Sequence, residues 1–64
     1  MLKNLLAEKI ARRLTNQEMA NIIGVSRPTY ENKVRNGKFT VSECKAFMKY
    51  FNETFEVLFK SDND

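Results

Sequence analysis

The stretch that decides the fold covers residues 14–37 and reads LTNQEMANIIGVSRPTYENKVRNG. Thr15 and Glu18 form a Thr-x-x-Glu capping box, in which each side chain pairs with the other residue's backbone N–H, and this box predicts a helix beginning after Thr15. Gly24 predicts the end of that helix, because glycine adopts the left-handed conformation at low cost. The helix has about two turns, and a second helix is expected after the glycine.

The second helix of this pair is predicted to begin near Ser26, a good N-cap residue, and to run to about Arg35, with Gly37 closing it. Pro28 suits the first turn of a helix, but it disfavours helical angles at Arg27, so the sequence leaves the start open by one residue. Three further residues are spaced around the turn so that the two helices can approach closely: Ala20, Val25 and Tyr30.

Helices are also predicted on both sides of this pair. A helix over residues 2–13 is indicated by apolar residues at helical spacing, namely Leu2, Leu5, Leu6, Ile10 and Leu14. A second capping box at Thr40 and Glu43 predicts a helix whose inward stripe is Val41, Cys44, Phe47, Met48 and Phe51. A last short turn, capped by Asn52 or Thr54, carries Phe55, Leu58 and Phe59. The expected fold is all-α, a compact single domain of five short helices over residues 1–60, followed by a polar tail at residues 61–64.

Composition argues against several kinds of protein. The 64 residues include no His, no Trp and one Cys, so neither a common metal site nor an internal disulfide is expected, and an intracellular, cytoplasmic location is the natural expectation. The N-terminal region carries charges where a signal peptide needs an apolar core, and no uncharged stretch is long enough to cross a membrane. The eight acidic residues are scattered and no nucleophile lies beside a base, so we expect no enzyme, cofactor, metal or small-molecule ligand.

The net charge of +3 is distributed unevenly along the chain. Residues 1–38 carry eight basic and three acidic side chains, whereas residues 39–64 carry three basic and five acidic ones. Such asymmetry suits a polyanionic partner, although an uneven solvated surface gives the same counts. The positive half of the chain is the half that contains the predicted helix pair.

Residues 14–27 resemble the helix-turn-helix of the phage Cro and lambda-repressor family. Residues 32–38, NKVRNGK, resemble the loop after that family's recognition helix, and residues 52–59, NETFEVLF, resemble its closing helix. The resemblance extends over residues 2–59. It implies a five-helix transcriptional regulator, such as a phage or prophage repressor, that binds double-stranded DNA as a homodimer on a palindromic operator in the bacterial cytoplasm or nucleoid.

The chain departs from the family pattern at four positions. Asn16 stands where Gln is usual, and Lys33 stands where an apolar residue is usual. Arg35 looks like an extra residue before the glycine turn, and Pro28 replaces a polar side chain that often reads a base. The departure at Pro28 puts one position of base readout in doubt.

The second helix of the pair carries side chains that suit base reading in a major groove. Arg27, Glu31 and Arg35 follow one another at i, i+4 and i+8, on one face. Arg27 is suited to two hydrogen bonds with guanine, and Asn32 is suited to adenine. Glu31 either accepts a hydrogen bond from cytosine N4 or bridges the two arginines.

Contacts with phosphates complete the predicted site, and Pro28 and Thr29 are expected to contact a thymine methyl. Asn16 and Gln17 lie at the N-terminus of the first helix of the pair, where free N–H groups favour an anion. Lys33, Arg35 and Lys38 are expected to border the groove on the other side. The full set of predicted DNA-contacting residues is Asn16, Gln17, Ser26, Arg27, Pro28, Thr29, Glu31, Asn32, Lys33, Arg35 and Lys38.

The apolar residues near the C-terminus outnumber what so small a core normally hides, so part of them is expected to join two copies of the chain. Phe51, Phe55 and Phe59 are the predicted contact residues, and Cys44 is expected to be a small core residue. In the alternative function this apolar face binds another regulator, as an antirepressor does, and the helix pair is only a scaffold. Replacing Arg27 separates the two functions, because DNA binding alone depends on it.

Overall fold

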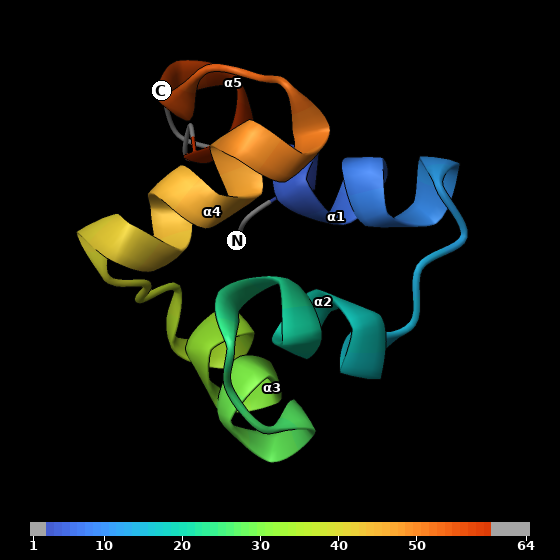
Figure 1. Cartoon of the computed structure of the whole chain (residues 1–64), viewed down its shortest axis with the longest axis vertical. Coiled ribbons are helices and arrows are strands. Elements are labelled where there is room, and N and C mark those ends of the chain that lie inside the picture. The colour runs from blue at the N-terminus through green and yellow to red at the C-terminus, as the bar shows by residue number, and fades with distance from the viewer. Residues whose placement is uncertain (1–2, 60–64) are drawn as a thin grey trace.

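The computed structural model describes residues 3–59, and every regular element in that range is an α-helix. The helices are α1 (Lys3–Ala11), α2 (Asn16–Ile23), α3 (Arg27–Asn36), α4 (Val41–Phe51) and α5 (Phe55–Phe59) (Figure 1). The all-α, five-helix prediction is confirmed for this range, whereas Leu2 and the predicted tail at residues 61–64 lie outside it. The radius of gyration is 10.6 Å, and a compact domain of this length is expected to have about 10.7 Å.

Both predicted capping boxes are formed. The Thr15 hydroxyl accepts a hydrogen bond from the Glu18 backbone N–H at 3.1 Å, and the Glu18 carboxylate accepts one from the Thr15 N–H at 2.9 Å. Thr40 and Glu43 make the same pair of contacts, at 3.1 and 2.9 Å. Each box satisfies two N–H groups that a helix start leaves without a partner, and this fixes where α2 and α4 begin.

The ends of α3 are set by a serine and a glycine. Ser26 is the N-cap, and its hydroxyl accepts from the Thr29 N–H at 3.3 Å, so α3 begins at Arg27 and the open start is resolved in favour of the earlier residue. Pro28 occupies the first turn, as expected. Gly24 ends α2 with φ of 74°, and Gly37 ends α3 with φ of 67°. Both are in the left-handed region, where only glycine avoids a steric cost.

The core takes side chains from all five helices: Leu5, Met19, Ala20, Tyr30, Cys44, Phe47, Phe51 and Leu58. Ala20 and Tyr30 close the wedge between α2 and α3, and the partly buried Val25 packs against the same core. Figure 1 shows α3 and α5 at opposite ends of the molecule's longest axis, with α2 packed on α3 and α1 packed on α5. The buried ring of Tyr30 therefore anchors α3 to the rest of the domain.

Three sequence predictions need correction. Helix α1 ends at Ala11 rather than near residue 13, because Arg13 adopts a left-handed conformation with φ of 55°. Ile10 is 71% exposed and Val41 is 73% exposed, although both were placed on inward stripes. Ile10 lies in the last turn of α1 and Val41 is the first residue of α4, and at a helix end the spacing alone does not show whether a neighbouring helix covers the side chain.

The turn between α4 and α5 also resolves an open alternative. The Thr54 hydroxyl accepts from the Val57 N–H at 3.3 Å, so Thr54 caps α5. Asn52 instead ends α4, in the left-handed conformation with φ of 55°. Asparagine tolerates this conformation better than most residues do.

Candidate functional site

The outward side of α3 is a continuous helical surface. At about 100° per residue, five residues lie next to one another on this side. We call them the α3 strip: Arg27, Pro28, Glu31, Asn32 and Arg35. Four of them are exposed and Glu31 is partly buried. Because α3 is unbroken from Arg27 to Asn36, these side chains are presented on a regular helix.

Glu31 lies in the middle of the α3 strip and is held by a residue of α2. The side-chain amide of Asn16 donates from Nδ2 to Glu31 Oε2 at 2.9 Å. Within residues 3–59, Glu31 forms no ion pair with Arg27 or Arg35, so the predicted bridge between the two arginines is wrong. Instead, Arg35 Nη1 donates to Asn32 Oδ1 at 2.8 Å, since residues three apart on a helix are neighbours.

Arg27 has the most available polar side chain in the α3 strip. It is exposed, and in the described part of the chain its guanidinium has no hydrogen bond or ion pair. The neighbouring polar groups serve the helix cap, because Ser26 Oγ and Thr29 Oγ1 are hydrogen-bonded to each other at 2.9 Å. Lys38 is exposed in the loop after α3. A guanidinium offers five donors in a fixed plane, so Arg27 has its full donor set available for a ligand.

The N-terminus of α2 lies beside the α3 strip through the contact between Asn16 and Glu31. Asn16 is partly buried, whereas Gln17 is exposed and donates from Nε2 to Asn21 Oδ1 at 3.0 Å. Asn16 therefore contacts the α3 strip, whereas the Gln17 side chain is hydrogen-bonded to another residue of α2.

Lys33 faces α4 rather than the α3 strip. Its ammonium lies 3.1 Å from Glu43 Oε1, and both residues are partly buried. Burial alone raises the pKa of Glu43, but the hydrogen bond from the Thr40 backbone N–H and the charge of Lys33 outweigh it, and the net pKa is lowered. One carboxylate thus both caps α4 and connects it to the end of α3, which leaves Lys33 less available for a phosphate than the exposed Arg35 and Lys38.

The Tyr30 hydroxyl is an unusual polar group in this core. The side chain is 1% exposed, and within the described residues its oxygen has no hydrogen-bond partner. Burial, and after it the negative charge of Glu31, raise the pKa of Tyr30. Tyr30 borders a cavity of about 240 Å³ together with Leu6, Lys9, Asn16, Glu31 and Val34. Sequence reasoning assigned Tyr30 to packing only, because spacing shows that a residue points inward and not whether its hydroxyl finds a partner.

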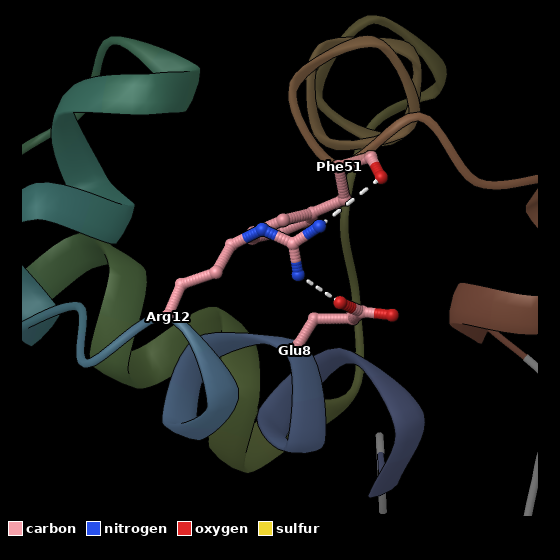
Figure 2. A network of polar contacts seen from close by, with 3 residues as sticks. All are labelled: Glu8, Arg12 and Phe51. Carbon is pink, nitrogen blue, oxygen red and sulfur yellow. Dashed lines mark hydrogen bonds and ion pairs between the residues drawn. The ribbon is translucent and has the colours of Figure 1, made fainter.

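The predicted interface between two copies needs one correction. Phe51 is 2% exposed, so it belongs to the core and offers almost no surface to a second chain. Arg12 covers it: the guanidinium lies 4.9 Å from the centre of the Phe51 ring, forms an ion pair with Glu8 and donates to the Phe51 carbonyl oxygen at 3.4 Å (Figure 2). Because Phe51 is the last residue of α4, Arg12 caps a carbonyl that the helix itself cannot satisfy.

Phe55 and Phe59 have surface where Phe51 does not. Phe55 is 53% exposed and Phe59 is partly buried, and their ring centres are 5.2 Å apart. Phe55 and the exposed Val41 border a groove of about 360 Å³ that is completed by Phe39, Cys44, Lys45 and Met48. Val41 was missed as a surface residue because helical spacing places it on the same face as the buried Cys44. We call Val41, Phe55 and this groove the apolar face.

Residues 3–59 contain neither a membrane-spanning helix nor a cluster of metal-ligating side chains. None of the helices there is both long enough and apolar enough to span a membrane. No three His, Cys, Asp or Glu side chains in this range are placed to hold a metal ion.

Comparison of the chain with protein-family models, with curated proteins and with solved structures gives no match.

Proposed function

We propose that this protein is a sequence-specific DNA-binding regulator of the Cro and lambda-repressor type, which inserts α3 into the major groove of an operator. The observation that carries the proposal is the α3 strip, an unbroken and largely exposed helical surface whose N-terminal arginine has no hydrogen bond or ion pair within residues 3–59. Two capped helices joined at Gly24 and locked by Ala20 and Tyr30 support it, because a groove-reading helix needs a rigid platform. The major groove is about 12 Å wide and accepts one α-helix.

In this proposal the residues of the strip have distinct roles. Arg27 forms two hydrogen bonds with guanine, and Asn32 contacts adenine. Pro28 and Thr29 offer apolar surface to a thymine methyl. Phosphates are contacted from the flanks by Arg35 and Lys38, by Gln17 and by the backbone N–H groups at the start of α2.

Two copies joined through the apolar face are proposed to bind a palindromic operator. An exposed apolar surface at Val41 and Phe55 favours such pairing, since contiguous apolar patches on small domains mark interfaces. The same observation favours the second candidate function, in which this face binds a different regulator and α3 contacts no DNA.

Selection of binding sites from random duplexes tests the proposal. We expect an inverted repeat to be enriched, with a guanine whose selection depends on Arg27. Arg27→Ala is expected to weaken binding to that site by about 1 to 3 kcal/mol and to relax the preference at one position. Lys49→Ala removes the same charge from α4 and serves as the matched control, with less than about twofold change. If the intact protein enriches no sequence, the DNA-binding proposal is wrong.

A further inference from the structure

The contact between Asn16 and Glu31 places a negative charge in the middle of a surface that the proposed function brings against DNA. In the α3 strip, Glu31 lies between Arg27 and Arg35. A carboxylate facing phosphates or the acceptor atoms of bases is repelled, so its place in the strip needs a specific partner. The partner seen in the structure is Asn16, a neutral amide, which leaves the charge of Glu31 intact.

The same contact also limits where the carboxylate can go. Asn16 comes from the first turn of α2, fifteen residues earlier in the chain, and holds Oε2 at 2.9 Å. While that bond is made, Glu31 is kept from either arginine, and Arg27 stays available. Within residues 3–59 Oε1 has no hydrogen-bond or ion-pair partner, so it is the atom that remains free to accept a hydrogen bond.

Base chemistry narrows the choice of ligand for Oε1. In the major groove, guanine N7 and O6 and thymine O4 are acceptors and repel a carboxylate. Adenine offers its N6 amino group but places the acceptor N7 beside it, whereas cytosine offers the N4 amino group without an acceptor of its own in the groove. Cytosine is therefore the base that a fixed, charged carboxylate prefers.

We infer that Glu31, held in place by Asn16, selects a cytosine in the operator, and that Asn16 is a positioning residue for this readout rather than a phosphate contact. The inference rests on the proposed DNA-binding function and adds a specificity element to it. Arg27 and Glu31 are four residues apart, about 6 Å along the helix axis, so they read different base pairs, which stack about 3.4 Å apart.

The test is binding-site selection from random duplexes with the full chain and four variants. The intact protein is expected to enrich a cytosine at one position in each half of the site. Glu31→Gln keeps the shape of the side chain and its contact with Asn16 but removes the charge, and it is expected to lower the cytosine preference at that position at least about fivefold and to shift it toward adenine, the base a neutral amide prefers. The rest of the selected sequence is expected to stay unchanged.

Asn16→Ala and Asn16→Asp test the positioning role. Both are expected to lower the cytosine preference at the same position about three- to tenfold, Asn16→Asp by repelling the carboxylate. Asn16→Asp also introduces an acid into the first turn of α2, where a negative charge favours the helix, so a folded variant remains available if the alanine variant unfolds. Asn21→Ala removes another exposed side-chain amide of α2 that has no proposed role in DNA binding and is the matched control, with the cytosine preference retained.

The possible failures are distinguishable. Enrichment of no sequence by the intact protein overturns the DNA-binding proposal and this inference with it. An enriched sequence whose cytosine preference survives Glu31→Gln overturns the inference alone. Uniform weakening by Asn16→Ala, with every base preference unchanged, shows that Asn16 contacts a phosphate and overturns its positioning role.

Discussion

Replacing Tyr30 with phenylalanine is expected to stabilise the protein. The ring keeps its packing in the core, including the tilted contact with Phe39 at 6.4 Å between ring centres. The only atom removed is the hydroxyl oxygen, which is buried and has no partner within residues 3–59. Leaving such a group unsatisfied costs about 1 to 3 kcal/mol, so its removal is expected to raise the free energy of unfolding by about 1 kcal/mol.

That gain is large for a domain of this size. The unfolding entropy scales with length and is about 0.13 kcal/mol/K for 64 residues, so 1 kcal/mol corresponds to a rise in Tm of about 7 °C. Thermal and urea unfolding followed by circular dichroism measure both values, and the urea dependence is expected to stay unchanged. Tyr50→Phe removes an exposed hydroxyl and is the control, with less than about 0.5 kcal/mol of change.

The opposite result has a clear meaning. If Tyr30→Phe lowers the stability by about 1 kcal/mol, the hydroxyl has a hydrogen-bond partner in solution, and the reasoning from an unsatisfied group is refuted. Water in the neighbouring cavity of about 240 Å³ is then the natural partner, because Asn16 and Glu31 line the same cavity with polar groups.

The pH dependence of the protein's stability provides a second test of Tyr30. Burial, followed by the charge of Glu31, raises the pKa of Tyr30 above its ordinary value of 10.0. As the pH rises past 10, the unfolded chain releases this proton first, the folded state binds more protons and stability falls. Tyr30→Phe is expected to lose this part of the alkaline destabilisation. The part due to Cys44 is expected to remain, because burial raises its pKa as well.

Three further predictions concern an ion pair, the apolar face and the salt dependence. Glu43→Gln is expected to lower the free energy of unfolding by about 1 kcal/mol at neutral pH and by little in acid, because the lowered pKa of Glu43 contributes stability that is lost as the pH falls. Urea unfolding at pH 7 and pH 3 measures the difference. An equal loss of stability at both pH values contradicts the prediction. Phe55→Asp is expected to reduce self-association, measured by sedimentation, without loss of stability. Phe51→Ala, a core substitution, is expected to lower the free energy of unfolding by about 3 to 5 kcal/mol. If the wild-type protein is strictly monomeric at micromolar concentration, the homodimer proposal is wrong. Binding by a dimer that contacts about eight phosphates is expected to give a slope near −7 when log K is plotted against log salt, and a slope near zero shows that the basic half of the chain is not used.

The helices were predictable because their boundary signals are local. Each capping box joins residues three apart, and the Gly24 backbone N–H donates to the carbonyl oxygens of Ala20 and Asn21, so the partners of these contacts lie within four residues of each other. Burial at helix ends was not predictable in the same way. Ile10 and Val41 have the spacing of core residues, but spacing defines a face and not how far the neighbouring helices extend over it.

In the candidate site, too, features set by one helix were predictable from the sequence, and contacts between helices were not. Helical geometry places Arg27, Glu31 and Arg35 on one face, and in the structure both arginines are exposed, whereas Glu31 is partly buried and lines the cavity that Tyr30 borders. The hydrogen bond between Asn16 and Glu31 depends on how α2 packs against α3, and neither of the two partners that the sequence suggested for the carboxylate was Asn16. The contact of Arg12 with the Phe51 carbonyl spans 39 positions of sequence and likewise depends on how the helices pack.

The dimensions of the domain constrain how two copies can present α3. Recognition helices on a two-fold operator lie about 34 Å apart, or one turn of DNA. The domain is 29 Å along its longest axis, and Figure 1 places α3 and α5 at opposite ends of that axis. If two copies join end to end through α5, their combined length is about twice 29 Å and the α3 helices lie near its two outer ends, which is too far for adjacent turns of DNA. The proposed homodimer therefore needs a two-fold axis beside the domain, closer to α3, and Val41, at the end of α4 that follows α3 in the chain, is the exposed apolar residue that favours such an interface.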